Sequence, residues 1–107
     1  MAKAYLVVRS VVADEASRAA FDRWYSTEHL PDAVRDFGVK RGWRGWSRTD
    51  PSAHLAFYEF ADVAAVQRAQ ASDATRALVA EFDRAFPKVT RTREIIEVAD
   101  EIGASAG

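Results

Sequence analysis

The order of the patterns along the sequence predicts an α+β fold of the ferredoxin-like type, in which a four-stranded antiparallel sheet carries its helices on one face. Stretches rich in Val, Tyr, Phe and Trp, which are typical of strands, alternate with stretches whose apolar residues recur at helical spacing. Their order along the 107 residues is strand, helix, strand, strand, helix, strand. The expected strands are 4–12, 39–49, 54–60 and 88–98, and the expected helical stretches are 15–29, 31–37, 63–71 and 74–86.

The first helix is expected to begin after Asp14, because an aspartate side chain can accept a hydrogen bond from the free N–H groups of a first turn. We expect this helix to end at His29. Leu30 precedes Pro31, and the residue before a proline is biased away from the helical conformation. Pro31 can then open a short second helical stretch, which Gly38 ends.

Glycines, turns and caps organise the second half of the chain. Gly42 and Gly45 interrupt the strand 39–49, which indicates a bulge or a close backbone approach. The turn 50–52 joins this strand to the aromatic strand 54–60, so the two form a hairpin. Asp62 and Asp73 are the expected N-caps of the last two helical stretches.

Both faces of the predicted sheet carry apolar side chains. In the strand 54–60, Leu55 and Phe57 point to one face and Tyr58 and Phe60 to the other, because side chains alternate along a strand. The helices can cover only one of these faces. We therefore expect a homodimer, in which a second copy of the chain covers the other face of the sheet.

The composition excludes several classes of protein. The chain contains no cysteine, which rules out disulfides, thiolate metal sites and cysteine nucleophiles. Its formal net charge of −1 gives no indication of nucleic-acid binding. No apolar run reaches the roughly 18–20 residues that a membrane span requires, and the N-terminus does not resemble a signal peptide. We expect a single domain, residues 1–107, located in the cytoplasm without membrane contact.

Two runs carry a resemblance to a known family: residues 24–31 (WYSTEHLP) and residues 37–43 (FGVKRGW). An aromatic-rich helix that ends in a histidine, followed by a glycine and a strand, resembles the EthD-like proteins of the dimeric α/β-barrel superfamily. This resemblance implies two ferredoxin-like subunits packed sheet to sheet. The superfamily includes cofactor-free monooxygenases, polyketide cyclases, lactone isomerases, haem-using enzymes and stress-responsive proteins of no known activity, so the fold alone does not select a reaction.

The resemblance singles out His29 as the candidate acid or base, since histidine is the side chain whose ordinary pKa lies nearest neutrality. A position in the last turn of a helix would raise its pKa and suit a proton donor. Tyr25, one turn earlier, is the candidate to orient a substrate carbonyl or to bond His29. Trp24 is expected to line the same pocket and to exclude water. The alternatives are ordinary core packing for the two aromatic residues and a backbone-bonded helix end for His29.

Further ligand contacts are expected from the strands. Arg44 and Trp46 share one face of their strand, opposite Trp43, and an arginine between aromatic rings can hold an anionic or phenolic group. Trp and Arg also anchor protein interfaces, so the same residues can instead belong to a dimer contact. Phe57 completes the expected substrate-binding set.

The remaining charged and metal-binding residue types form no recognisable site. His54 follows a turn and is expected at a solvated strand end. Lys88, Arg91 and Arg93 are interleaved with glutamates and are expected on a solvated or cross-strand paired face. Because the chain lacks metal-ligand spacing, a phosphate loop and a haem-attachment motif, we expect neither a metal nor a cofactor.

Two functions follow. The first is a cofactor-free enzyme that acts on a small apolar or aromatic carbonyl compound, by proton transfer or by oxygenation of a phenol, with His29 moving the proton. The second is a non-catalytic ligand-binding or stress-responsive dimer, in which His29 is structural.

Overall fold

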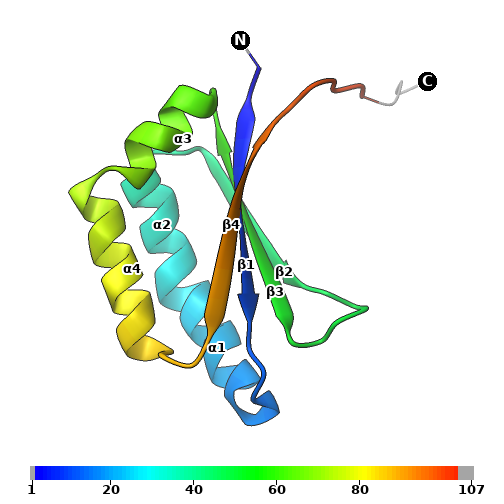
Figure 1. Cartoon of the computed structure of the whole chain (residues 1–107), viewed down its shortest axis with the longest axis vertical. Helices are drawn as coiled ribbons and strands as arrows, with labels where there is room; N and C mark the ends of the chain where they lie inside the picture. The colour runs from blue at the N-terminus through cyan, green and yellow to red at the C-terminus, as the bar shows by residue number, and fades with distance from the viewer. Residues whose placement is uncertain (1, 104–107) are drawn as a thin grey trace.

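A computed structural model describes residues 2–103. Its sheet has the strand order β2-β3-β1-β4, and all three neighbouring pairs are antiparallel. The helices lie together on one face of this sheet (Figure 1). The predicted ferredoxin-like α+β fold is therefore confirmed. The strands are β1 (Ala4–Val11), β2 (Arg41–Trp46), β3 (Ala53–Phe60) and β4 (Thr90–Glu97), and the helices are α1 (Arg18–Trp24), α2 (Leu30–Phe37), α3 (Val63–Gln70) and α4 (Asp73–Ala85).

Side chains accept hydrogen bonds from the free backbone N–H groups at the helix starts, largely as the sequence predicts. The Asp14 carboxylate accepts a hydrogen bond at 3.1 Å from a backbone N–H of the 3₁₀ turn Glu15–Ser17 (η1), and Asp62 caps α3 at 2.8 Å. The prediction that Asp73 caps α4 is wrong. Ser72 has the extended backbone of a cap and its hydroxyl accepts from the N–H of Thr75, so Asp73 is the first helical residue.

The first helical stretch does not end at His29. A single π-helical turn, Tyr25–His29 (η2), joins α1 to α2 without a break. The N–H of Leu30 bonds the carbonyl of Tyr25, one residue further back than in an α-helix. Pro31, which has no N–H to donate to the preceding turn, is the second residue of α2. The wider turn thus accommodates the proline that was expected to end the helix.

The helix α2 packs very closely on β2. A Cβ atom placed on Gly42 would lie 2.6 Å from Cγ2 of Val34 and 3.1 Å from the Tyr58 ring, so only glycine leaves room for this packing. The predicted close approach is confirmed at Gly42. No neighbour lies near an added Cβ at Gly45, and β2 pairs with β3 residue for residue without a bulge.

The face of the sheet that the helices leave open is apolar and aromatic. The rings of Trp43 and Phe57 stack on it with centroids 4.0 Å apart and an interplanar angle of 13°. Tyr5, Val7 and Ile96 border the same patch. Trp43 and Ile96 remain 45% and 43% exposed, respectively. Within residues 2–103, no helix is long and apolar enough to cross a membrane.

Candidate functional site

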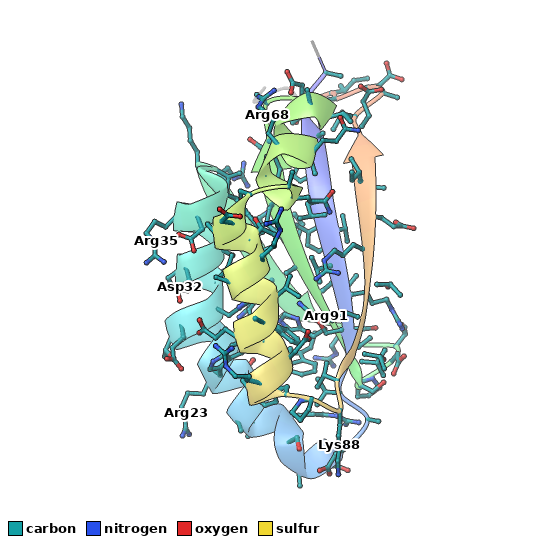
Figure 2. All side chains as sticks on the ribbon, turned by 60° about the vertical axis from the view of Figure 1, so that its left-hand side comes forward. Arg23, Asp32, Arg35, Arg68, Lys88 and Arg91 are labelled. Atoms are coloured by element: carbon teal, nitrogen blue, oxygen red, sulfur yellow. The ribbon has the colours of Figure 1, made fainter. Side chains whose placement is uncertain are left out.

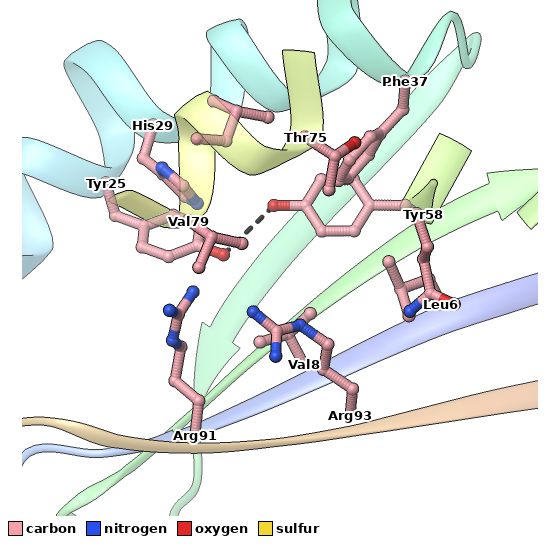
Figure 3. A pocket seen from close by; sticks show the side chains of 12 residues that line it. Leu6, Val8, Tyr25, His29, Phe37, Tyr58, Thr75, Val79, Arg91 and Arg93 are labelled. Carbon is pink, nitrogen blue, oxygen red and sulfur yellow. Dashed lines mark hydrogen bonds between the residues drawn. The ribbon is translucent and has the colours of Figure 1, made fainter. Parts of the chain in front are cut away.

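A cavity of about 220 Å³ lies between the sheet and the helices (Figure 3). Its lining comes from both layers. Strands β1, β3 and β4 contribute side chains from the sheet, and the π turn and helices α2 to α4 contribute side chains from the other side. Its apolar walls are Leu6, Val8, Phe37, Leu78 and Val79, and its polar lining is Tyr25, His29, Tyr58, Gln70, Thr75, Arg91 and Arg93. This volume lies below the roughly 300–1,000 Å³ of pockets for drug-sized ligands, so the cavity suits only a smaller organic molecule.

The π turn brings Tyr25 and His29 to the cavity together. Tyr25 is 1% exposed and His29 7% exposed, and their ring centroids are 4.9 Å apart. The His29 ring also stacks on Trp24 at 4.8 Å and meets the edge of Phe82 at 5.4 Å. These aromatic neighbours fix the orientation of the imidazole. Glu28, directly before His29, is exposed.

Burial sets the protonation state of His29. Desolvation, followed by the nearby charge of Arg91, lowers the pKa of His29 to about 4. The expectation of a raised pKa at a helix end is wrong, because the helix continues past His29 and the ring is enclosed. At neutral pH the imidazole is uncharged and suits a proton acceptor. Its Nδ1 is buried and has no hydrogen-bond partner among the described residues.

Two tyrosine hydroxyls form the second polar element of the cavity. The hydroxyl oxygens of Tyr25 and Tyr58 lie 3.1 Å apart, within hydrogen-bond distance (Figure 3). Burial raises the pKa of Tyr25 to about 12 and raises the pKa of Tyr58 above its usual range. Both phenols are therefore protonated at neutral pH. The hydroxyl of Tyr25 bonds Tyr58 rather than His29, and only one of the two protons is used in their mutual bond.

The sequence analysis missed the two arginines of the cavity. Arg91 is not solvated: its side chain is 10% exposed and lies between β4 and α4, whereas Arg23 and Arg35 project away from the molecule (Figure 2). Arg93 lines the same cavity from its rim and remains exposed, as the sequence predicted. The signal that could have found them is their spacing of two, which places both on the face of β4 that carries the cavity.

Arg44 and Trp46 belong to a different cluster. The Asp22 carboxylate accepts hydrogen bonds from Arg44 at 2.9 Å and from the Trp46 indole at 2.8 Å. His54 lies beside them, with its Nε2 3.3 Å from the Arg44 guanidinium. These side chains lie between the helices and the sheet, as His29 does, but they do not line the cavity beside His29. The arrangement ties α1 to the hairpin of β2 and β3.

The prediction that His54 is solvated is wrong. His54 is completely buried, because it occupies a helix-facing position of β3 opposite Ser10 and is covered by the Phe21 ring at 5.1 Å. Burial, with Arg44 as the next cause, lowers the pKa of His54 to about 4.

Two other predicted ligand contacts lie outside the cavity. Trp24 packs behind the His29 ring and does not itself line the space. Phe57 lies on the open face of the sheet, stacked on Trp43, and so points away from His29. In the part of the chain that the structure describes, no group of three or more His, Asp or Glu side chains is placed to hold a metal ion.

Comparisons with known proteins identify the fold. No family model and no curated protein sequence matches the chain. Among solved structures, SnoaB, a cofactor-independent oxygenase from Streptomyces nogalater, is similar with a TM-score of 0.73 and 16% identity over 97% of this chain and 100% of that one. An EthD-family protein from Bacillus halodurans has a TM-score of 0.70 at 18% identity, covering 89% of this chain and 98% of its own.

A third structure, a putative antibiotic biosynthesis monooxygenase from Deinococcus radiodurans, has a TM-score of 0.69 at 13% identity, with 95% of this chain and 99% of that one covered. Identities this low show a common fold and leave the chemistry open. The likeness to the EthD-like proteins that the sequence predicted is confirmed at the level of the fold, and this chain has the ferredoxin-like architecture of these proteins.

Proposed function

We propose that this protein binds a small apolar or aromatic carbonyl compound beside His29 and removes a proton from it without a cofactor. One observation supports this proposal above the others. A neutral, buried imidazole lies at a cavity of about 220 Å³ that also contains two protonated phenols and a guanidinium. A base, hydrogen-bond donors and a positive charge are the groups that proton abstraction next to a carbonyl requires.

The proton balance of the step is simple. A nitrogen of His29 accepts the proton from the carbon next to the carbonyl, and the electron pair stays on the substrate as an enolate. A tyrosine hydroxyl and Arg91 stabilise the charge that develops on the oxygen. Because the pKa of His29 is low, the imidazolium returns the proton readily. The enolate formed beside it stabilises the imidazolium by its negative charge while both are present. Such a step begins isomerisations, cyclisations and dehydrations, and ionisation of a phenol begins its oxygenation.

We also propose that the protein is an EthD-like homodimer joined through the open face of the sheet. The aromatic patch around Trp43 and Phe57 supports this arrangement, because a monomer would leave it in contact with water. The fold shared with an EthD-family protein and with SnoaB supports it as well. In such a dimer Phe57 would contact the partner rather than the ligand.

The test is hydrogen–deuterium exchange of a small aromatic ketone, 2-tetralone, followed by NMR in D₂O. The wild-type protein should accelerate exchange of the acidic hydrogens next to the carbonyl. His29→Gln should lower that rate by at least about 100-fold, because general-base catalysis contributes on this order. Glu28→Gln, at the exposed neighbouring position, should leave it unchanged.

Each other result has a definite meaning. Exchange that survives in His29→Gln would contradict the role of His29. Binding of the ketone without any accelerated exchange, in the wild type and in the variant alike, would favour the non-catalytic ligand-binding protein.

A further inference from the structure

The cavity beside His29 carries more positive charge than its lining balances. Arg91 and Arg93 both extend from β4 toward the hydroxyls of Tyr25 and Tyr58 (Figure 3). The lining contains no aspartate and no glutamate. A cavity with two cations and no anion in its wall is suited to a negatively charged ligand.

Arg91 is only partly neutralised. Its Nη2 donates to Asp83 at 2.8 Å, but Asp83 lies on the rim, with its side chain 63% exposed. The Arg91 guanidinium carbon lies 3.8 Å from the centre of the Phe82 ring, within the range of a cation–π contact. A guanidinium has five N–H donors in a fixed plane, so most donors of Arg91 are not used by Asp83.

The two arginines repel each other. The positive charge of Arg93, after burial itself, lowers the pKa of Arg91 below its usual range. Arg93 forms no ion pair with any carboxylate of residues 2–103. An anion placed between the two guanidinium groups would relieve this repulsion and accept charge-assisted hydrogen bonds from both.

We infer that the cavity takes its ligand as an oxyanion, with an aromatic or apolar body against Tyr25, Tyr58 and Leu78 and its negatively charged oxygens between Arg91 and Arg93. The oxyanion is either a carboxylate of the ligand or an ionised enol or phenol. This inference rests on the proposed function in that both concern the same cavity. It adds that Arg91 and Arg93 determine specificity for charge, a property that His29 does not supply.

The experiment is isothermal titration calorimetry with 2-naphthoate and its neutral counterpart 2-naphthamide at neutral pH and low salt. The wild type should bind the naphthoate at least tenfold more tightly than the amide. Arg93→Gln and Arg91→Gln should each weaken naphthoate binding about tenfold and leave amide binding within about twofold. Arg48→Gln, which removes the same charge from the exposed loop between β2 and β3, should change neither.

Arg93→Gln keeps the test valid if the loss of the Arg91–Asp83 pair disturbs folding, because Arg93 holds no such pair among the described residues. A second probe, 4-nitrophenol, separates the two kinds of oxyanion. If the cavity prefers ionised phenols, the yellow phenolate band will appear at lower pH in the presence of the protein, and Arg93→Gln will abolish this shift. Naphthoate binding without this shift identifies a carboxylate.

Equal affinity of the wild type for naphthoate and naphthamide, together with no shift for 4-nitrophenol, would overturn the inference. An anion preference that is unchanged in both arginine variants would overturn it as well. These results are distinct from those on proton transfer. A protein that prefers naphthoate through its arginines but does not exchange the hydrogens of 2-tetralone would support the charge preference and contradict the proposed catalysis.

Discussion

The hydroxyl oxygens of Tyr25 and Tyr58 lie 3.1 Å apart at the cavity, although one comes from the π turn and the other from a central strand. This hydrogen bond joins the helical layer to the sheet at the wall of the cavity. Both phenols are almost fully buried, and the pKa of each is raised by that burial. The pair is thus a structural link and a source of an available O–H donor.

Replacing Tyr58 with phenylalanine should lower the free energy of unfolding by about 1 kcal/mol at neutral pH, because one buried hydrogen bond is lost. The same variant should also lose less stability at high pH. The folded state keeps its tyrosines protonated while the unfolded chain ionises them, so the wild type loses stability as the pH rises from about 10 through about 12. Urea unfolding from pH 8 to pH 11 measures both effects. If stability falls as steeply with rising pH in Tyr58→Phe as in the wild type, burial of the Tyr58 hydroxyl is not a cause of the alkaline loss.

The two buried histidines should make the protein sensitive to mild acid. Each has a folded-state pKa of about 4 against an ordinary value of 6.5, so below pH 6.5 protons bind the unfolded chain preferentially. Stability should fall as the pH drops from 6.5 to 4, by up to about 3 kcal/mol for each histidine. His29→Gln and His54→Gln should each remove part of this slope in chemical denaturation. The Asp22 carboxylate, whose pKa is lowered by its hydrogen bonds from Arg44 and Trp46, adds its own loss of stability at more acidic pH.

If neither histidine variant changes the slope between pH 6.5 and 4, the two rings are not held in their neutral forms. Retained sensitivity in only one variant would assign the effect to the other histidine.

Two glycines of β2 form a matched pair for testing the contact of α2 with the sheet. Gly42→Ala should lower the free energy of unfolding by about 1–3 kcal/mol, because the new methyl group would meet Val34 and the Tyr58 ring. Gly45→Ala adds the same group where nothing lies within 4 Å, and it should change stability by less than about 0.5 kcal/mol. Thermal or urea unfolding compares the two variants. A second change, Val34→Ala, should recover part of the loss in Gly42→Ala and leave Gly45→Ala without benefit.

The proposed homodimer predicts a particle of twice the chain mass in light scattering. Trp43→Lys should shift it toward the monomer, because the lysine would place a charge in the centre of the aromatic patch. Ile102→Lys changes another exposed apolar residue, one that does not line the patch, and should not alter the mass. A wild-type monomer at the highest concentration tested would contradict the arrangement.

The fold was predictable because its signals are local. Strand alternation, the caps at Asp14 and Asp62, and the glycine that ends α2 each depend on a few neighbouring residues, and together they give the order of elements. Gly38 adopts a positive φ of 69°, which few other residues tolerate. Such features appear in the sequence without knowledge of what packs against them.

Only part of the candidate site was predictable, because the burial of its residues depends on which helix packs on which strand. His29 and Tyr25 stood out as a histidine and an aromatic residue one turn apart. Arg91 stands between two threonines as a solvated strand residue would, and only the position of α4 over β4 encloses it. His54 follows a turn, yet the first helix covers it. The sequence shows alternation along a strand, but it does not show which face the helices will cover.

The π-helical turn between α1 and α2 has a consequence for how this site could arise or be lost. It contains one more residue per hydrogen-bonded ring than an α-helix, so a single inserted codon separates the two geometries. Deleting one residue from this turn would restore regular α-helical winding and rotate His29 by about 100° relative to α1. The scaffold would keep its sheet and its other helices, while the imidazole would leave its place beside Tyr25. Three nucleotides thus distinguish a chain with a histidine at its cavity from a chain of the same fold without one.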